Sequence, residues 1–164
     1  MDASSTTAKY NLKKNRSILI YIGGEKEQLM TETNKQKIYL LNRKGFIKLA
    51  LQYGAQLVPM YAFGENELYT SSNLFLGWRK YLQHHFNLGI PICWGRGGSW
   101  LPHRVPIHIE FGKPLVVSKH VSTEEISQEQ IDEIHAEFVK EMKRLFDRTK
   151  TKYPQYQDSQ LEIL

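Results

Sequence analysis

Apolar and polar residues alternate along the chain in short blocks, and the spacing within each block predicts one kind of secondary structure. Continuous apolar runs rich in β-branched residues are typical of strands buried on both faces of a sheet. Residues 88–94 form an apolar run interrupted by Pro91. Other apolar runs predict strands at 17–22, 37–41 and 57–63. Alternation of apolar and polar residues predicts a further strand at 106–111.

Two amphipathic helices accompany these strands. One runs from Arg43 to Tyr53 and ends at Gly54, and the other follows Ser127 and Gln130, which have the spacing of a capping box. Because strand and helix signals alternate, the sequence predicts an α/β fold, with a mainly parallel sheet flanked by helices.

The first of these helices begins with an unusual charge pattern. Asn42 is the predicted N-cap, so Arg43 and Lys44 fall in the first turn, where cations oppose the helix dipole. This pattern is compatible with an anion clamp, and two solvated basic side chains are the alternative.

A third helix is predicted over residues 73–86, and its apolar face is unusually aromatic. An aromatic, basic amphipathic helix is compatible with a position in a membrane interface, although such a face is more commonly buried in a core. The pattern leaves both interpretations open. Apolar or aromatic residues at helical spacing on this face are Leu74, Trp78, Tyr81, Leu82 and His85.

Composition narrows the range of partners. The net charge of +5 favours anionic ones, namely phosphates, an acidic cofactor, an anionic membrane surface or nucleic acid. The single cysteine, Cys93, excludes an intrachain disulfide. Residues 1–16 are polar and basic, so we expect disorder there, and no apolar run approaches the ~18 residues of a membrane-spanning helix.

One long motif occupies residues 43–65 and carries a family resemblance. The sequence resembles the type-2 diacylglycerol acyltransferase family over about residues 17–153, with 154–164 as a tail. The central motif is met by Arg43, Gly45, Phe46, Lys48, Ala50, Gly54, Leu57, Val58, Pro59, Phe63, Gly64 and Glu65. Two shorter family blocks are met by Gly23, Gly24 and Glu27, and by Gly95, Arg96 and Gly97.

The resemblance implies transfer of a fatty acyl group from acyl-CoA to a hydroxyl of diacylglycerol, monoacylglycerol or a fatty alcohol. Acyl-CoA is then a donor substrate, and neither a cofactor nor a metal is expected. The family's base is a histidine in an HPHG block, which none of the six histidines of the chain matches. We therefore expect no catalytic residue in this chain. The resemblance implies that residues 17–153 are the C-terminal part of the catalytic domain, with a glycerolipid-acyltransferase-like fold that is incomplete on its N-terminal side.

Two groups of residues are then candidates for supporting roles. Gly23, Gly24, Glu27, Glu65 and Asn66 are predicted to line the pocket for the acceptor or to orient the base. The predicted contacts to acyl-CoA phosphates are Arg43, Lys44, Lys48 and Arg96. For the full-length context, the resemblance implies the cytosolic face of the endoplasmic reticulum membrane and no nucleic-acid partner.

Two alternatives follow from the same residues. A soluble basic module that binds phosphorylated ligands or RNA would also account for the positive charge, the glycine turns and Arg96. A non-catalytic paralogue that partners a complete enzyme would account for the missing histidine.

Overall fold

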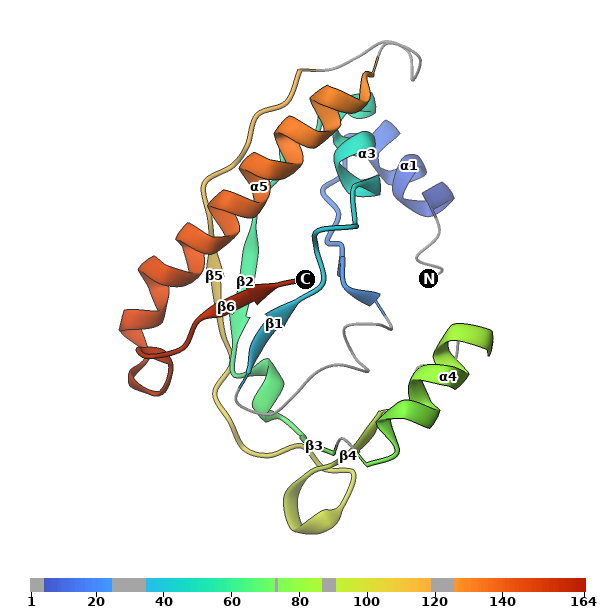
Figure 1. Cartoon of the computed structure of the whole chain (residues 1–164). Coiled ribbons are helices and arrows are strands. Elements are labelled where there is room, and N and C mark those ends of the chain that lie inside the picture. The colour runs from blue at the N-terminus through green and yellow to red at the C-terminus, as the bar shows by residue number, and fades with distance from the viewer. Residues whose placement is uncertain (1–4, 25–34, 73, 87–90, 119–125) are drawn as a thin grey trace.

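The computed structural model describes residues 5–24, 35–72, 74–86, 91–118 and 126–164. It is a mixed α/β structure in which one long helix lies across short strands (Figure 1). Its elements are α1 Ser5–Lys13, β1 Gln36–Ile38, α3 Gly45–Tyr53, β2 Met60–Phe63, η1 Glu65–Glu67, β3 Thr70–Ser72, α4 Leu76–Phe86, β4 Ile92–Trp94, η2 Arg96–Gly98, β5 His108–Phe111, α5 Gln128–Thr149, η4 Lys150–Lys152, η5 Pro154–Tyr156 and β6 Leu161–Ile163.

Helix α5 organises the core. The predicted capping box is confirmed: Gln130 N donates to Ser127 Oγ at 3.2 Å, and Ser127 N donates to Gln130 Oε1 at 3.2 Å. The helix packs against α3, β2, β5 and β6. Its buried hydrophobic face consists of Ile131, Phe138, Met142, Leu145 and Phe146.

The prediction of a mainly parallel sheet is wrong for the described residues. β1 pairs with β6 in parallel, but β2 pairs with β5 and β3 with β4 in antiparallel fashion. A parallel partner for β2 would need a crossover that returns along the sheet. The chain instead leaves β2 at Phe63 and comes back beside it at His108, so the two strands form a hairpin with a long connection.

The N-terminal end of the chain also differs from expectation. Residues 17–22 form no strand, and Leu19 and Tyr21 are 64% and 72% exposed. A strand needs a hydrogen-bonded neighbour, and no described strand pairs with residues 17–22. The expectation of disorder before Ser17 also fails at Ser5–Lys13, which forms α1 and packs against α3.

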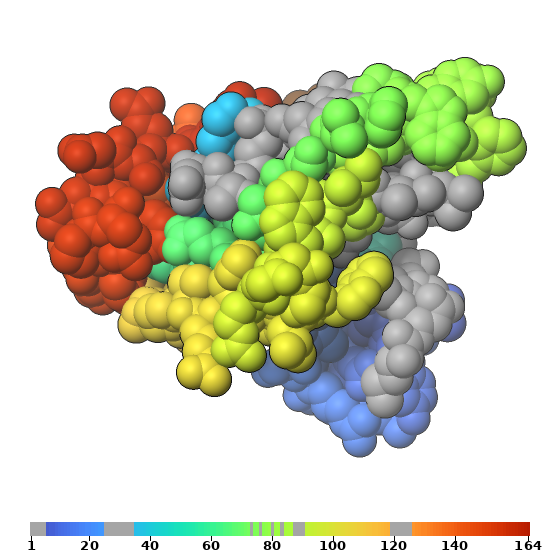
Figure 2. Space-filling model, turned by 90° about the horizontal axis from the view of Figure 1, so that it is seen from below, coloured from blue at the N-terminus to red at the C-terminus, as the bar shows by residue number. Residues whose placement is uncertain are grey.

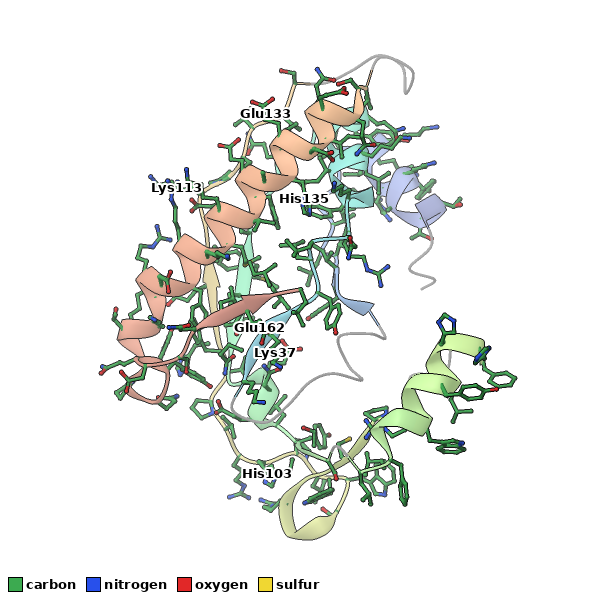
Figure 3. All side chains as sticks on the ribbon, viewed as in Figure 1. Lys37, His103, Lys113, Glu133, His135 and Glu162 are labelled. Atoms are coloured by element: carbon green, nitrogen blue, oxygen red, sulfur yellow. The ribbon has the colours of Figure 1, made fainter. Side chains whose placement is uncertain are left out.

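The segment predicted to be a tail is part of the fold. β6 runs parallel to β1, and Leu164 N donates to Ile38 O at 2.9 Å. Lys37 and Glu162 form an ion pair across the two strands at 3.4 Å (Figure 3). Tyr156 is buried in the core cluster.

The described residues between 68 and 107, which we call the arm, extend beyond the end of the β2–β5 pair. They contain β3, α4, β4 and η2, at the opposite end of the molecule from α3 (Figure 1). Seen from below, green and yellow atoms of the arm cross the middle of this face (Figure 2). Among the described side chains, no hydrophobic residue of the arm belongs to the core cluster or packs against it. Within the described part of the chain, no helix has the length and apolarity needed to cross a membrane.

Candidate functional site

The structure brings Arg43 to the glycine pair that lies twenty positions before it. Arg43 Nη2 donates to Gly23 O at 3.4 Å, and the same nitrogen lies 3.8 Å from where a Cβ on Gly24 would be. Gly24 has φ +64°, in the region that favours glycine. We call Gly23, Gly24 and Arg43 the Arg43–glycine corner. It places an exposed guanidinium beside buried Gly23 and exposed Gly24, and a guanidinium in such a position suits binding of an anionic group.

Two further predicted cations lie at the start of α3. The helix begins at Gly45, with Lys44 at the N-cap and no side-chain cap, so the predicted N-cap at Asn42 is wrong. Lys44 Nζ donates to Asp132 Oδ1 at 2.7 Å, and this hydrogen bond lowers the pKa of the Asp132 carboxyl. Lys48 is exposed one turn further along. Lys44 thus forms an ion pair that holds the start of α3 against α5.

Glu65 and Asn66 lie immediately after β2, as predicted, but the strand end differs from the one expected. β2 belongs to an antiparallel pair, so the rule that ligands bind at the carboxyl ends of parallel strands does not apply to it. Glu65 is exposed, and Asn66 Nδ2 donates to Lys35 O at 3.1 Å. Asn66 therefore links η1 to the segment before β1.

Arg96 does not join the other predicted cations. It is exposed on η2 in the arm, at the opposite end of the molecule from α3 (Figure 1). Glu27 lies outside the described residues. The structure therefore brings Gly23, Gly24 and Arg43 together, pairs Lys44 with Asp132, and places Arg96 on the arm. The roles proposed for all of these residues stay predictions.

Three of the described histidines contact groups of other segments. The ring Nε2 of buried His135 lies 3.0 Å from Leu40 O, and His103 Nε2 lies 3.1 Å from Thr70 Oγ1. Figure 3 shows these two rings far apart, on α5 and on the arm. His108 stacks on Tyr153 at 4.6 Å between ring centroids. The expectation that no histidine of this chain takes the place of the family's base stays a prediction.

A polar cluster near the hairpin end was not predicted from the sequence. Glu110 accepts hydrogen bonds from Lys152 Nζ at 2.8 Å and from Tyr153 Oη at 2.7 Å. Close by, Tyr156 Oη donates to Glu67, and burial, reinforced by this bond, raises the pKa of the Tyr156 phenol. The partners are single residues of separate segments, and no local spacing links them.

This cluster predicts a dependence of stability on pH. The hydrogen bond from Lys152, with that from Tyr153, holds the pKa of Glu110 below its ordinary value of 4.5. A lowered carboxyl pKa contributes stability above pH 4.5 that is lost as the pH falls through the folded-state value. Glu110→Gln should therefore cost less than about 1 kcal/mol at neutral pH and flatten the loss of stability below pH 4.5. Urea unfolding across pH would show this, with Glu133→Gln on the exposed side of α5 as the control. An unchanged acid limb in Glu110→Gln would contradict the prediction.

Shallow depressions on the outer side of α5 lie apart from all these groups. They are lined by charged residues that include Lys113, Glu141 and Arg144. None of the predicted site residues lines either depression. The Arg43–glycine corner therefore remains the best-supported candidate site.

Comparison with known proteins assigns the family. A family model described as "Diacylglycerol acyltransferase" matches residues 1–164, the whole chain. The chain belongs to the diacylglycerol acyltransferase family. No solved structure matches it.

Curated relatives agree with this assignment. Human "Diacylglycerol O-acyltransferase 2" is 37% identical over 174 residues, which cover 98% of this chain and 44% of the relative. "Diacylglycerol O-acyltransferase 2" of Xenopus tropicalis is 37% identical, covering 96% of this chain and 47% of its own. "Diacylglycerol O-acyltransferase 1" of Saccharomyces cerevisiae is 36% identical, covering 98% and 40%. The chain thus spans less than half the length of these relatives.

Proposed function

We propose that this chain is the C-terminal part of the catalytic domain of an acyl-CoA-dependent O-acyltransferase. The enzyme would transfer a fatty acyl group to diacylglycerol or a related acceptor in triacylglycerol synthesis, at the cytosolic face of the endoplasmic reticulum membrane. The observation that carries the proposal is the family match over the whole chain, together with the unbroken motif from Arg43 to Glu65. The glycerolipid-acyltransferase-like fold is part of the same proposal.

The proposed reaction sets clear chemical requirements. The acceptor hydroxyl attacks the thioester carbonyl, a base takes its proton, the carbon–sulfur bond breaks, and coenzyme A leaves as the thiol. Hydrogen-bond donors must stabilise the oxyanion that forms on the carbonyl. The base would be the histidine of the HPHG block, which the 164 residues of this chain do not contain.

Within this scheme, the Arg43–glycine corner would bind phosphate groups of the donor. The guanidinium has five N–H groups, and the bond to Gly23 O uses one of them. The others can form charge-assisted hydrogen bonds with a phosphate, which are stronger than bonds between neutral groups. Lys44 and Lys48 would add positive charge at the start of α3, whereas Arg96 lies on η2 in the arm, which extends at the other end of the molecule from α3.

A chimera tests this function. In the chimera, residues 1–164 of this chain replace the matching residues of the yeast relative. The chimera is expressed in cells that cannot make triacylglycerol. We expect the chimera to restore triacylglycerol synthesis. Arg43→Glu in the chimera should raise the KM for acyl-CoA roughly tenfold or more, because one charge-assisted contact is lost and repulsion is added.

The matched control is Lys143→Glu, which reverses an exposed charge on α5. A chimera that accumulates in the membrane without making triacylglycerol would contradict the proposed activity and favour a non-catalytic paralogue. An active chimera in which Arg43→Glu leaves the KM for acyl-CoA unchanged would remove Arg43 from the donor site.

A further inference from the structure

The arm carries an exposed aromatic surface. All three tryptophans of the chain, Trp78, Trp94 and Trp100, lie on it, and they are 63%, 41% and 89% exposed. Phe75, which precedes α4, and Phe86, its last residue, are 67% and 62% exposed. Among the described residues, the aromatic face of α4 is therefore exposed and is not packed in the core. Large exposed apolar patches on a protein usually mark a binding surface.

Hydrogen bonds within the arm hold its segments together. The exposed aromatic rings therefore belong to an ordered part of the structure. Arg79 is 4% exposed, and its Nη1 donates to Ser72 O at 2.7 Å and to Leu74 O at 3.2 Å. These bonds join α4 to the end of β3. On the other side, His103 N donates to Leu68 O at 2.8 Å.

The charge of the arm is one-sided. Residues 68–109 contain no Asp or Glu, although the whole chain has 17. The same residues contain the cations Arg79, Lys80, Arg96 and Arg104, which is most of the net charge of +5. Arg96 and Arg104 are exposed. The surface is therefore complementary to an anionic partner.

Aromatic rings and cations together identify the kind of partner. Tryptophan and tyrosine prefer the headgroup region of a bilayer, where the ring is partly buried and its polar atom stays hydrated. Basic side chains beside them are attracted to anionic lipid headgroups. Helix α4 has 11 residues and is about 16 Å long, so it suits a position in the plane of the interface rather than across the ~30 Å core.

We propose that the arm docks on the surface of an anionic lipid bilayer. The exposed rings of Phe75, Trp78, Trp94 and Trp100 enter the interface, while Arg96 and Arg104 contact lipid phosphates. The inference rests on the membrane location proposed above and names the surface responsible. It also gives Arg96 a role compatible with its distance from the Arg43–glycine corner.

Tryptophan fluorescence of the full chain tests the proposal directly, because every tryptophan lies on the arm. The chain is titrated with vesicles of phosphatidylcholine alone or mixed with phosphatidylserine. We expect the emission to shift to the blue as the rings leave water. The shift should occur at lower lipid concentration with phosphatidylserine, and added salt should weaken this preference.

Paired variants assign the effect to the arm. Phe75→Ser with Trp78→Ser should weaken vesicle binding, measured by co-sedimentation, by roughly tenfold or more. Ile109→Ser with Phe111→Ser, at 53% and 62% exposure on β5, is the matched control and should bind like the parent.

A second pair tests the charges. Arg96→Glu with Arg104→Glu should abolish the preference for phosphatidylserine. Lys140→Glu with Lys143→Glu makes the same change of charge on the exposed side of α5 and should preserve the preference.

Three results would overturn the docking surface. In the first, the emission of the parent chain does not shift with either vesicle. In the second, an arm variant and its control lose binding equally. In the third, tryptophan emission is already blue without lipid, which would mean that the rings of the arm are covered in solution. The measurement involves no acyl-CoA. An inactive chimera with a vesicle-binding chain would therefore refute the acyltransferase function and leave this surface standing.

Discussion

Replacement of Gly64 by alanine should lower the free energy of unfolding by about 3 kcal/mol or more. Gly64 has φ +93°, which an L side chain rarely adopts. A Cβ there would lie 2.3 Å from Pro106 O, a backbone atom that has no flexible end to move aside. Either β2 or the returning strand must shift, and with it the root of the arm. Urea unfolding followed by far-UV circular dichroism measures the change.

Gly45→Ala is the matched control for this prediction. Gly45 is the first residue of α3, its φ is not positive, and nothing lies within 4 Å of a Cβ built on it. Alanine there should be neutral or stabilising by up to about 1 kcal/mol. Equal losses for the two variants would show that the contact between Gly64 and Pro106 does not set the geometry of the hairpin end.

The contrast between these glycines shows what a sequence motif does and does not reveal. Gly45 and Gly64 belong to the same family motif, yet only Gly64 is required by a close backbone approach. Gly95 has a similar constraint, since its Cβ would lie 1.8 Å from Leu101 O. Phe63 is fully buried, whereas Glu65 is exposed and accessible to a ligand. The motif thus mixes structural and candidate functional positions, and spacing cannot separate them.

Local signals predicted some of the local structure, although the strand expected at 17–22 does not form. The periodicity and the capping box placed α5 correctly, and the apolar run placed β2. Pairing between strands could not be predicted, because register and direction depend on residues far apart in sequence. β6 has three residues and no distinctive pattern, yet it pairs with β1 across more than a hundred positions. The antiparallel partner of β2 depends on where the arm returns, which no window of sequence records.

The candidate site was predicted only in part, for the same reason. The resemblance named both Arg43 and the glycine pair, and the structure places them in contact. It also named Arg96, which lies at the other end of the molecule. The hydrogen bonds of Glu110 with Lys152 and Tyr153 escaped prediction, because a polar contact between separate segments leaves no periodic trace. The sequence also could not predict whether the aromatic face of α4 is buried, because a core helix and an interfacial helix have the same aromatic pattern.

Phe63→Ala should cost about 3–5 kcal/mol, the second large effect that the structure predicts. Phe63 is 0% exposed and is the centre of an aromatic cluster. Its ring centroid lies 4.8 Å from Tyr61, 5.5 Å from Phe146 and 5.1 Å from Tyr156. Removing the ring leaves a cavity where β2, α5 and the C-terminal segment meet, and it also removes favourable edge-to-face contacts.

The control for this substitution lies on the neighbouring strand. Phe111 is 62% exposed on β5, so Phe111→Ala should change the free energy of unfolding by less than about 0.5 kcal/mol. Urea unfolding of both variants, followed by circular dichroism and by tryptophan emission, separates the core from the arm. We expect Phe63→Ala to shift the circular-dichroism midpoint strongly. If Phe63→Ala and Phe111→Ala unfold alike, the aromatic cluster does not anchor the hairpin, and the positions of Glu65 and the arm need another explanation.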